Sequence, residues 1–162
     1  MMINVNMPSE LTDLLGLNLL NKSLPAGITR KDIVFIDLMG KNAIIEEENF
    51  KAGFIYKVIA ALGYENFYEI ENKAYCYNRA AKSALMCRLP LSAIVCAEKA
   101  ILSYGHLILK GKGNIGSFQK EVNDFIPKKI KRSLEMLKDQ NASSSDYEHD
   151  WFTMQQTENI EA

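Results

Sequence analysis

The segment that comes closest to a chemical motif is rich in glycine. Residues 111–116, GKGNIG, match the pattern G-x-G-x-x-G, in which backbone N–H groups approach the pyrophosphate of a dinucleotide. Such a site also needs a second parallel strand and an acidic residue about 20 positions downstream. The sequence after Gly116 instead offers Pro127 and a charged helical pattern. We therefore expect an interhelical loop here, with no phosphate site and no cofactor.

Side chains that carry nucleophilic or metal chemistry are few and isolated. His106 and His149 form no HExxH pair and do not stand at metal-ligand spacing from a cysteine. Cys76, Cys87 and Cys96 lie within apolar helical pattern and make no CxxC pair, so we expect buried free thiols in a reducing compartment. The sequence thus predicts no catalytic residue, no metal site and no enzymatic activity.

A basic cluster is the remaining candidate, in this case for contact with nucleic-acid phosphates. Its members are Lys110, Lys112, Lys128, Lys129, Lys131 and Arg132. Lysines and arginines that neutralise phosphates supply most of the affinity that is independent of sequence. Apolar residues also recur at helical spacing from Ile126 to Leu137, which is typical of a packed helix with a solvated face. Nucleic-acid binding is therefore the second hypothesis.

Composition describes an ordinary globular protein. The 162 residues are 48% hydrophobic and 24% charged, with a formal net charge of −1, which gives no overall attraction to nucleic acid or to an anionic membrane. The N-terminal residues lack the basic start and apolar core of a signal peptide. No apolar run approaches the roughly 18 residues of a membrane span. We expect a cytoplasmic protein without membrane contact.

The elements that position these residues are predicted to be helices. A serine before leucines at helical spacing predicts a first helix over residues 10–21. Thr29 and Asp32 form a capping-box pattern before a second helix, which we expect to end at Gly40. Residues 33–36, IVFI, also suit a strand. We favour a helix there because no second convincing strand exists to pair with it.

The next two patterns are longer. Phenylalanine, valine and leucine at every fourth position predict a helix over 46–62, with acids in its first turn and Gly63 as its stop. Residues 66–109 alternate alanines with large apolar residues on both sides of Pro90. This alternation predicts an antiparallel helical hairpin, because small residues let two helix axes approach closely and proline is tolerated in a first turn.

Two shorter helices should follow the glycine-rich loop. Ser117 is expected to cap the first, which reaches Phe125, and Pro127 should separate it from a second helix over 128–138. The predicted fold is an all-α single-domain bundle of five to seven helices over residues 1–139, with the hairpin at its centre.

Residues 140–162 have the composition of a disordered acidic tail. They contain five acids and neither lysine nor arginine, and such a segment cannot bury enough surface to offset the cost of ordering. Trp151 and Phe152 form an apolar pair that could dock elsewhere. The acids could shield the basic cluster or compete for it.

The hairpin residues resemble a tetratricopeptide repeat. Residues 75–81, YCYNRAA, stand where such repeats often read Tyr-x-Asn-Arg-Ala, and Ala93-Ile94 with residues 98–101, EKAI, match the second helix. The likeness covers about a fifth of the chain, without a second repeat. It implies a protein-docking scaffold in which Asn78 would contribute to a peptide clamp. The lysines and arginine that complete such a clamp from neighbouring repeats are not recognisable.

The same hairpin is also similar to the HEPN helical domains of prokaryotic ribonuclease toxins, in which AEKA-like runs lie on a paired helix. Those nucleases carry an arginine followed four to six residues later by a histidine. No arginine stands at that spacing before His106 or His149. An HEPN-like domain would therefore imply an inactive copy, in line with the nucleic-acid hypothesis.

The favoured function is non-catalytic binding of a protein partner, as an adaptor, a chaperone or an inhibitor. Aromatic side chains are frequent anchors of such interfaces, although they also suit a core. The candidates for partner binding are Phe67, Tyr68, Tyr75, Tyr77 and Asn78. Self-association into a homo-oligomer is left open. The alternative is a nucleic-acid-associated helical protein that uses the basic helix 128–132.

Overall fold

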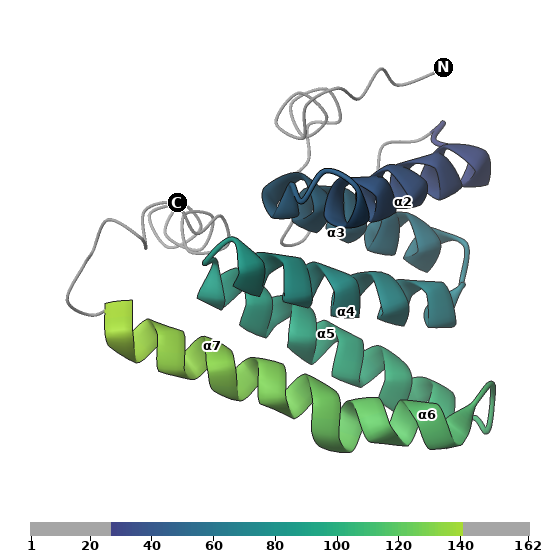
Figure 1. Ribbon diagram of the computed structural model, residues 1–162. Helices are drawn as coiled ribbons and strands as arrows, with labels where there is room; N and C mark the ends of the chain where they lie inside the picture. Colours follow the sequence, from purple (N-terminus) through teal and green to yellow (C-terminus); the bar gives the residue numbers. More distant parts are fainter. Residues whose placement is uncertain (1–26, 141–162) are drawn as a thin grey trace, which may run out of the picture.

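The computed structural model describes residues 27–140, which form an all-α bundle (Figure 1). The helical segments in chain order are α2 (Arg30–Ile45), α3 (Phe50–Asn66), α4 (Ile70–Met86), α5 (Pro90–Leu109), α6 (Ile115–Lys120), the π-helical turn η1 (Glu121–Phe125) and α7 (Ile126–Gln140). Because α6, η1 and α7 are continuous, the described residues form five helices, and the predicted all-α fold is confirmed. The first predicted helix, over 10–21, and residues 141–162 lie outside the described residues.

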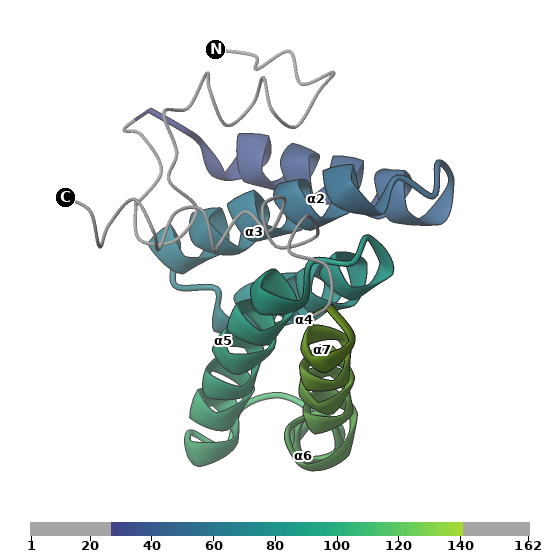
Figure 2. The same ribbon diagram turned by 90° about the vertical axis from the view of Figure 1, so that its left-hand side faces the viewer.

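Consecutive helices pack against one another in turn. α2 packs on α3, α3 on α4 and α4 on α5, while α7 returns along α5 and also touches α4. Figure 2 shows α2 and α3 on one side of α4, with α5 and α7 on the other. α4 is thus the central helix of the described chain, and α2 is an outer helix that rests mainly on α3.

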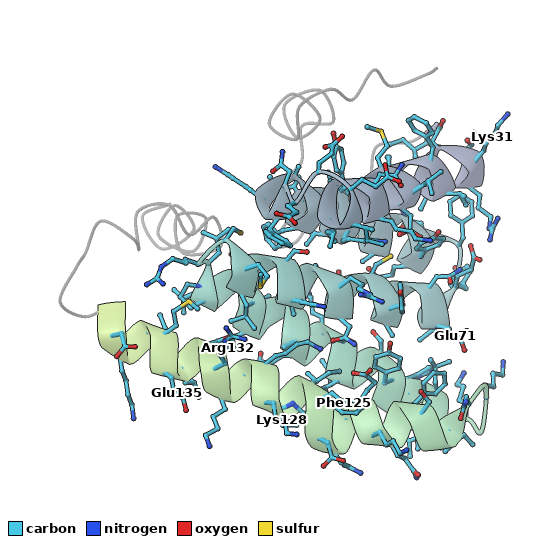
Figure 3. All side chains as sticks on the ribbon, in the orientation of Figure 1. Lys31, Glu71, Phe125, Lys128, Arg132 and Glu135 are labelled. Carbon is cyan, nitrogen blue, oxygen red and sulfur yellow. The ribbon has the colours of Figure 1, made fainter. Side chains whose placement is uncertain are left out.

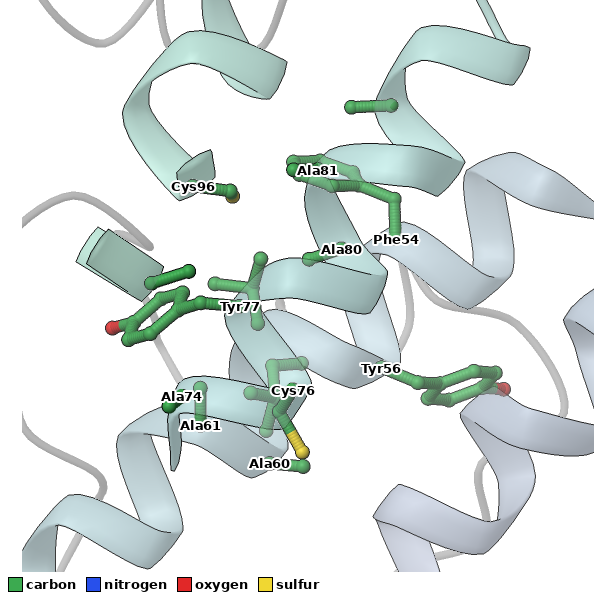
Figure 4. Packing of buried hydrophobic residues seen from close by; sticks show 14 of the residues in the cluster. Phe54, Tyr56, Ala60, Ala61, Ala74, Cys76, Tyr77, Ala80, Ala81 and Cys96 are labelled. Carbon is green, nitrogen blue, oxygen red and sulfur yellow. The ribbon is translucent and has the colours of Figure 1, made fainter. Parts of the chain in front are cut away.

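The predicted hairpin is confirmed as α4 and α5, with Pro90 at the first position of α5. Alanines fill its close contacts, and Ala80, Ala81 and Ala97 are fully buried. Figure 4 shows Phe54 of α3 beside Ala80 and Ala81 of α4. Small residues permit the close approach of the helices, and burial of a side chain such as Phe54 then contributes about 1.5–3 kcal/mol.

Two predicted helix ends are wrong because the glycines serve packing instead. α2 runs through Gly40 and α3 runs through Gly63. A Cβ atom on Gly63 would lie 2.2 Å from Cδ1 of Ile33, and one on Gly40 would lie 3.1 Å from Cβ of Tyr56. The missing side chains therefore allow α2 and α3 to approach each other.

The predicted start of α2 is correct, and the predicted start of α3 is wrong. The Thr29 hydroxyl accepts a hydrogen bond of 3.2 Å from the backbone N–H of Asp32, whose carboxylate accepts one of 3.0 Å in return. This capping box confirms the predicted start of α2 and lowers the pKa of Asp32. The acids 46–48 precede α3 rather than opening it, and Asn49 caps it by accepting from the N–H of Ala52.

The C-terminal helices also differ from prediction. Asn114 rather than Ser117 caps α6, because its Oδ1 accepts the backbone N–H of Ser117 at 3.2 Å. Pro127 does not interrupt the helix. The widened turn η1 ends two residues before Pro127 and contains Asn123. In a regular α-helix the proline ring would clash with the carbonyl group of Asn123.

The prediction about membrane-spanning segments is wrong for α5. Within the described residues, it alone is long and apolar enough to cross a membrane by length and composition, so the prediction that no run approaches this length is wrong. In this fold α5 packs against α4, α6 and α7, and a core helix requires the same apolar character.

Candidate functional site

A carboxylate in the middle of α2 joins three helices. Asp37 Oδ1 accepts a hydrogen bond of 2.5 Å from Lys57 Nζ, and Oδ2 accepts one of 2.8 Å from the Tyr64 hydroxyl, both on α3. The Cys76 thiol of α4 donates to Oδ1 at 3.4 Å. Lys57 is only 4% exposed, so its ammonium group depends on Asp37 for charge compensation.

Asp37 and Lys57 are not among the predicted site residues, although the sequence contains a signal for them. Asp37 stands within IVFIDLM and Lys57 within FIYKVIA, two otherwise apolar runs. A charge in a run that packing buries needs a partner, because desolvation of an unpaired ion is costly. The partner lies on another helix, which the spacing along one chain segment does not reveal.

Burial keeps the Cys76 thiol and the Tyr64 hydroxyl of this cluster protonated. Desolvation, and then the charge of Asp37, raise the pKa of the Cys76 thiol, while Lys57 acts in the opposite direction. Desolvation and the hydrogen bond to Asp37 also raise the pKa of Tyr64. Since the thiolate is the nucleophilic form of cysteine, Cys76 is unsuited to covalent chemistry. The cluster holds α2, α3 and α4 together.

We expect Cys87 to react with a thiol reagent before the other two cysteines. Cys87 is half-buried, whereas Cys76 and Cys96 are fully buried and the pKa of Cys76 is raised. Titration of the native protein with a chromogenic disulfide should show a fast phase that Cys87→Ser removes, with all thiols reacting in denaturant. A fast phase that survives Cys87→Ser would contradict the burial of Cys76 and Cys96.

A pocket lies beside the Asp37 cluster, between α2 and α4. Its volume is about 500 Å³, which falls within the range of ligand-binding pockets. It is lined by Val34, Asp37, Leu38, Lys41, Ile44 and Ile45 of α2, by Lys57 of α3, and by Tyr75 and Arg79 of α4. One wall is therefore mainly apolar and the other is aromatic and cationic.

Arg79 and Tyr75 form the α4 wall. Arg79 Nε donates to the Tyr75 hydroxyl at 3.0 Å, and the guanidinium carbon lies 5.0 Å from the centre of the Tyr75 ring. Lys57 Nζ lies 5.9 Å from the same ring. Within residues 27–140, neither Arg79 nor Lys41 forms a salt bridge, whereas Lys57 is paired with Asp37. The pocket therefore has a net positive charge.

The predicted aromatic anchors divide between surface and core. Tyr68 and Phe67 are exposed in the turn between α3 and α4, and Tyr75 is exposed at the pocket. Tyr77 is 4% exposed, so its predicted role as an exposed anchor is wrong. It packs in the core, and the ammonium group of Lys99 lies 5.7 Å from the centre of its ring.

Asn78 faces α7 rather than solvent. Its Nδ2 donates to Glu121 Oε2 at 3.0 Å, and its Oδ1 accepts from Lys129 Nζ at 2.7 Å. Burial lowers the pKa of Lys129, Glu121 raises it, and Lys82 and Arg79 lower it further. The amide of Asn78 thus joins α4 to α7 and is already occupied on both sides.

The structure divides the predicted basic cluster. Lys129 is turned toward α4, while the exposed members are Lys110, Lys112, Lys128, Lys131 and Arg132. Figure 3 shows Lys128 and Arg132 on α7. The two lysines before α6 are separated from Lys128 by roughly 20 Å of helix, because an α-helix rises about 1.5 Å per residue. Nucleic-acid binding through this set stays a prediction.

Comparisons with known proteins add no further candidate. No family model matches the sequence, and no curated protein or solved structure is significantly similar to the chain. Residues 111–114 of the glycine-rich segment form a loop between α5 and α6, with Gly111 and Gly113 at positive φ, whereas Ile115 and Gly116 belong to α6, where the predicted loop is wrong. In the part of the chain that the structure describes, no three His, Cys, Asp or Glu side chains gather as metal ligands. The pocket between α2 and α4 is therefore the candidate site.

Proposed function

We propose that this protein is a non-catalytic binding module that holds an acidic, apolar segment of a partner protein in the pocket between α2 and α4. The observation that carries this function is the lining of the pocket, which combines exposed aliphatic side chains with cations that form no salt bridge within residues 27–140. Clustered apolar surface beside charged groups is typical of interaction sites. Adaptor, chaperone and inhibitor roles all use binding of this kind.

The apolar wall has the geometry of a docking face. Val34, Leu38 and Ile45 are between 40% and 62% exposed although they are large and apolar. Their spacing of four and seven residues places them on one face of α2. A partner helix or extended segment lying along α2 would remove this face from water, which contributes about 25 cal/mol for each Å² of apolar surface buried.

The cationic wall selects the charge of the partner. Asp37 is neutralised by Lys57, which leaves Lys41 and Arg79 to attract carboxylates. Tyr75 offers an aromatic face held in place by Arg79, and side chains of this kind are common hot spots. Acidic groups beside an apolar anchor would satisfy both walls, and their attraction should fall as salt rises.

The test uses peptides selected from a random phage-displayed library on the full-length protein. We expect enrichment of sequences that combine acids with aromatic or aliphatic residues. Leu38→Asp should weaken their binding at least tenfold, or about 1.4 kcal/mol, because it places a carboxylate on the apolar wall. Affinity is measured by fluorescence anisotropy of the labelled peptides.

Leu102→Asp is the matched control for this experiment. Leu102 is also exposed, but it belongs to α5 and does not line the pocket, so its replacement should leave peptide affinity unchanged. Equal loss in both variants, or selected peptides that bind Leu38→Asp as well as the unchanged protein, would place binding elsewhere.

A further inference from the structure

We propose that the pocket between α2 and α4 is also the docking site of the chain's own segment around Trp151 and Phe152. Asp146, Glu148 and Asp150 lead directly into this aromatic pair, and residues 141–162 contain neither lysine nor arginine. The segment thus has the chemistry that the pocket lining selects, with apolar anchors preceded by carboxylates. Docking itself is independent of any partner, whereas competition with a partner rests on the proposed function.

Charge favours an approach along α4. Arg79 and Lys82 lie about one turn apart on α4, and Lys129 of the facing helix α7 is hydrogen-bonded to Asn78, which precedes Arg79 in the chain. Three cations therefore lie in one region. Glu121 also lies in this region, where its carboxylate accepts a hydrogen bond from Asn78. The carboxylates before Trp151 would meet these cations, since opposite charges within reach steer and orient a docked segment.

The other side of the pocket is less favourable to this segment. Acids 46–48 follow the end of α2, next to Ile45, and would repel a second acidic stretch. We therefore place the acids of the segment on the α4 side, with the aromatic pair against Val34 and Leu38 of α2. This orientation makes Arg79 the cation nearest to Asp150.

The connecting chain is long enough to reach the pocket. Lys129 is hydrogen-bonded to Asn78, the neighbour of Arg79. The 11 residues after Lys129, up to Gln140, rise about 16 Å along α7, so α7 ends about that far beyond the level of the pocket's α4 wall. Ten residues lie between Gln140 and Trp151, and a chain of ten residues can extend up to about 35 Å, which exceeds this distance.

Tethering lowers the affinity that docking requires. A segment held by a linker of this length experiences an effective concentration in the millimolar range. Weak contacts of one aromatic pair and a few exposed charges are then sufficient to fill the pocket in the isolated protein. A partner must displace the segment, so the apparent affinity of the partner is reduced by the fraction of closed molecules.

Intrinsic fluorescence tests docking directly, because Trp151 is the single tryptophan of the chain. In the full-length protein we expect blue-shifted emission and protection from acrylamide quenching. Leu38→Asp and Arg79→Glu should both shift the emission to that of exposed tryptophan, while Leu102→Asp should not. Emission of exposed tryptophan in the unchanged protein, or identical emission in Leu38→Asp, would overturn docking. A shift that disappears on dilution would assign the occupant to a second copy and overturn docking within one chain.

Peptide binding separates this inference from the proposed function. The full-length variant W151A/F152A should bind the phage-selected peptides about tenfold more tightly, because the tethered competitor is removed. Unchanged affinity, with binding still dependent on Leu38, would overturn competition and leave the proposed function intact. Protected Trp151, together with a W151A/F152A variant that also selects no peptides, would support docking and overturn the proposed function.

Discussion

Replacing Asp37 with Asn is expected to lower the free energy of unfolding by about 3 kcal/mol. The substitution preserves size but removes the charge that compensates the buried ammonium group of Lys57. Loss of one partner of a buried ion pair costs about 3–5 kcal/mol, and we take the lower end because the Asp37 side chain is 25% exposed. Urea denaturation followed by circular dichroism measures the change.

The matched control removes the other charge as well. The double variant Asp37→Asn, Lys57→Met should recover most of the lost stability, because no uncompensated charge then remains in the interior. Lys57→Met alone should cost less than Asp37→Asn, since Tyr64 and Cys76 still donate to the carboxylate. A double variant no more stable than Asp37→Asn would show that packing around Asp37, rather than charge, sustains this region.

Gly63→Ala is expected to destabilise the protein by about 2–3 kcal/mol although alanine favours helices. A Cβ atom at this position would lie 2.2 Å from Cδ1 and 2.5 Å from Cγ1 of Ile33. Ile33 is fully buried and cannot turn toward solvent. α2 must therefore move away from α3, which should appear as a lower urea midpoint with an unchanged slope.

Gly105→Ala provides the opposite result from the same chemical change. Gly105 lies within α5, and a Cβ atom there would meet nothing within 4 Å. Alanine should stabilise the helix by about 0.5–1 kcal/mol through its smaller loss of backbone entropy. In an Ile33→Val background, which removes Cδ1, the cost of Gly63→Ala should shrink. A neutral Gly63→Ala would contradict the close approach of α2 and α3.

Local signals in the sequence were sufficient for the helices of the hairpin and for the start of α2. The Thr29 capping box and the position of Pro90 depend on backbone groups within one turn, so neighbouring residues specify them. In the sequence, Gly40 and Gly63 look the same as glycines that end a helix. Their role depends on how close another helix comes, and the distance to α2 or α3 is not a property of either segment alone.

The candidate site shows the same division. Tyr75 was predicted as a partner-binding residue and does line the pocket, but Asp37 and Lys57 were missed because their pairing requires α2 to pack on α3. Tyr75 and Tyr77 are equivalent by residue type and neighbourhood. Because an α-helix turns about 100° per residue, two positions two residues apart point about 200° apart, and only one of them can face the core.

The sequence by itself determined that this chain is helical, because apolar spacing, caps and propensity act within a few residues. The tertiary structure decided which face of α4 is buried, which glycines lie where two helices approach closely, and which charged side chains pair across helices. Those choices follow from burying the largest apolar area while leaving no buried ion unpaired. They depend on every helix at once.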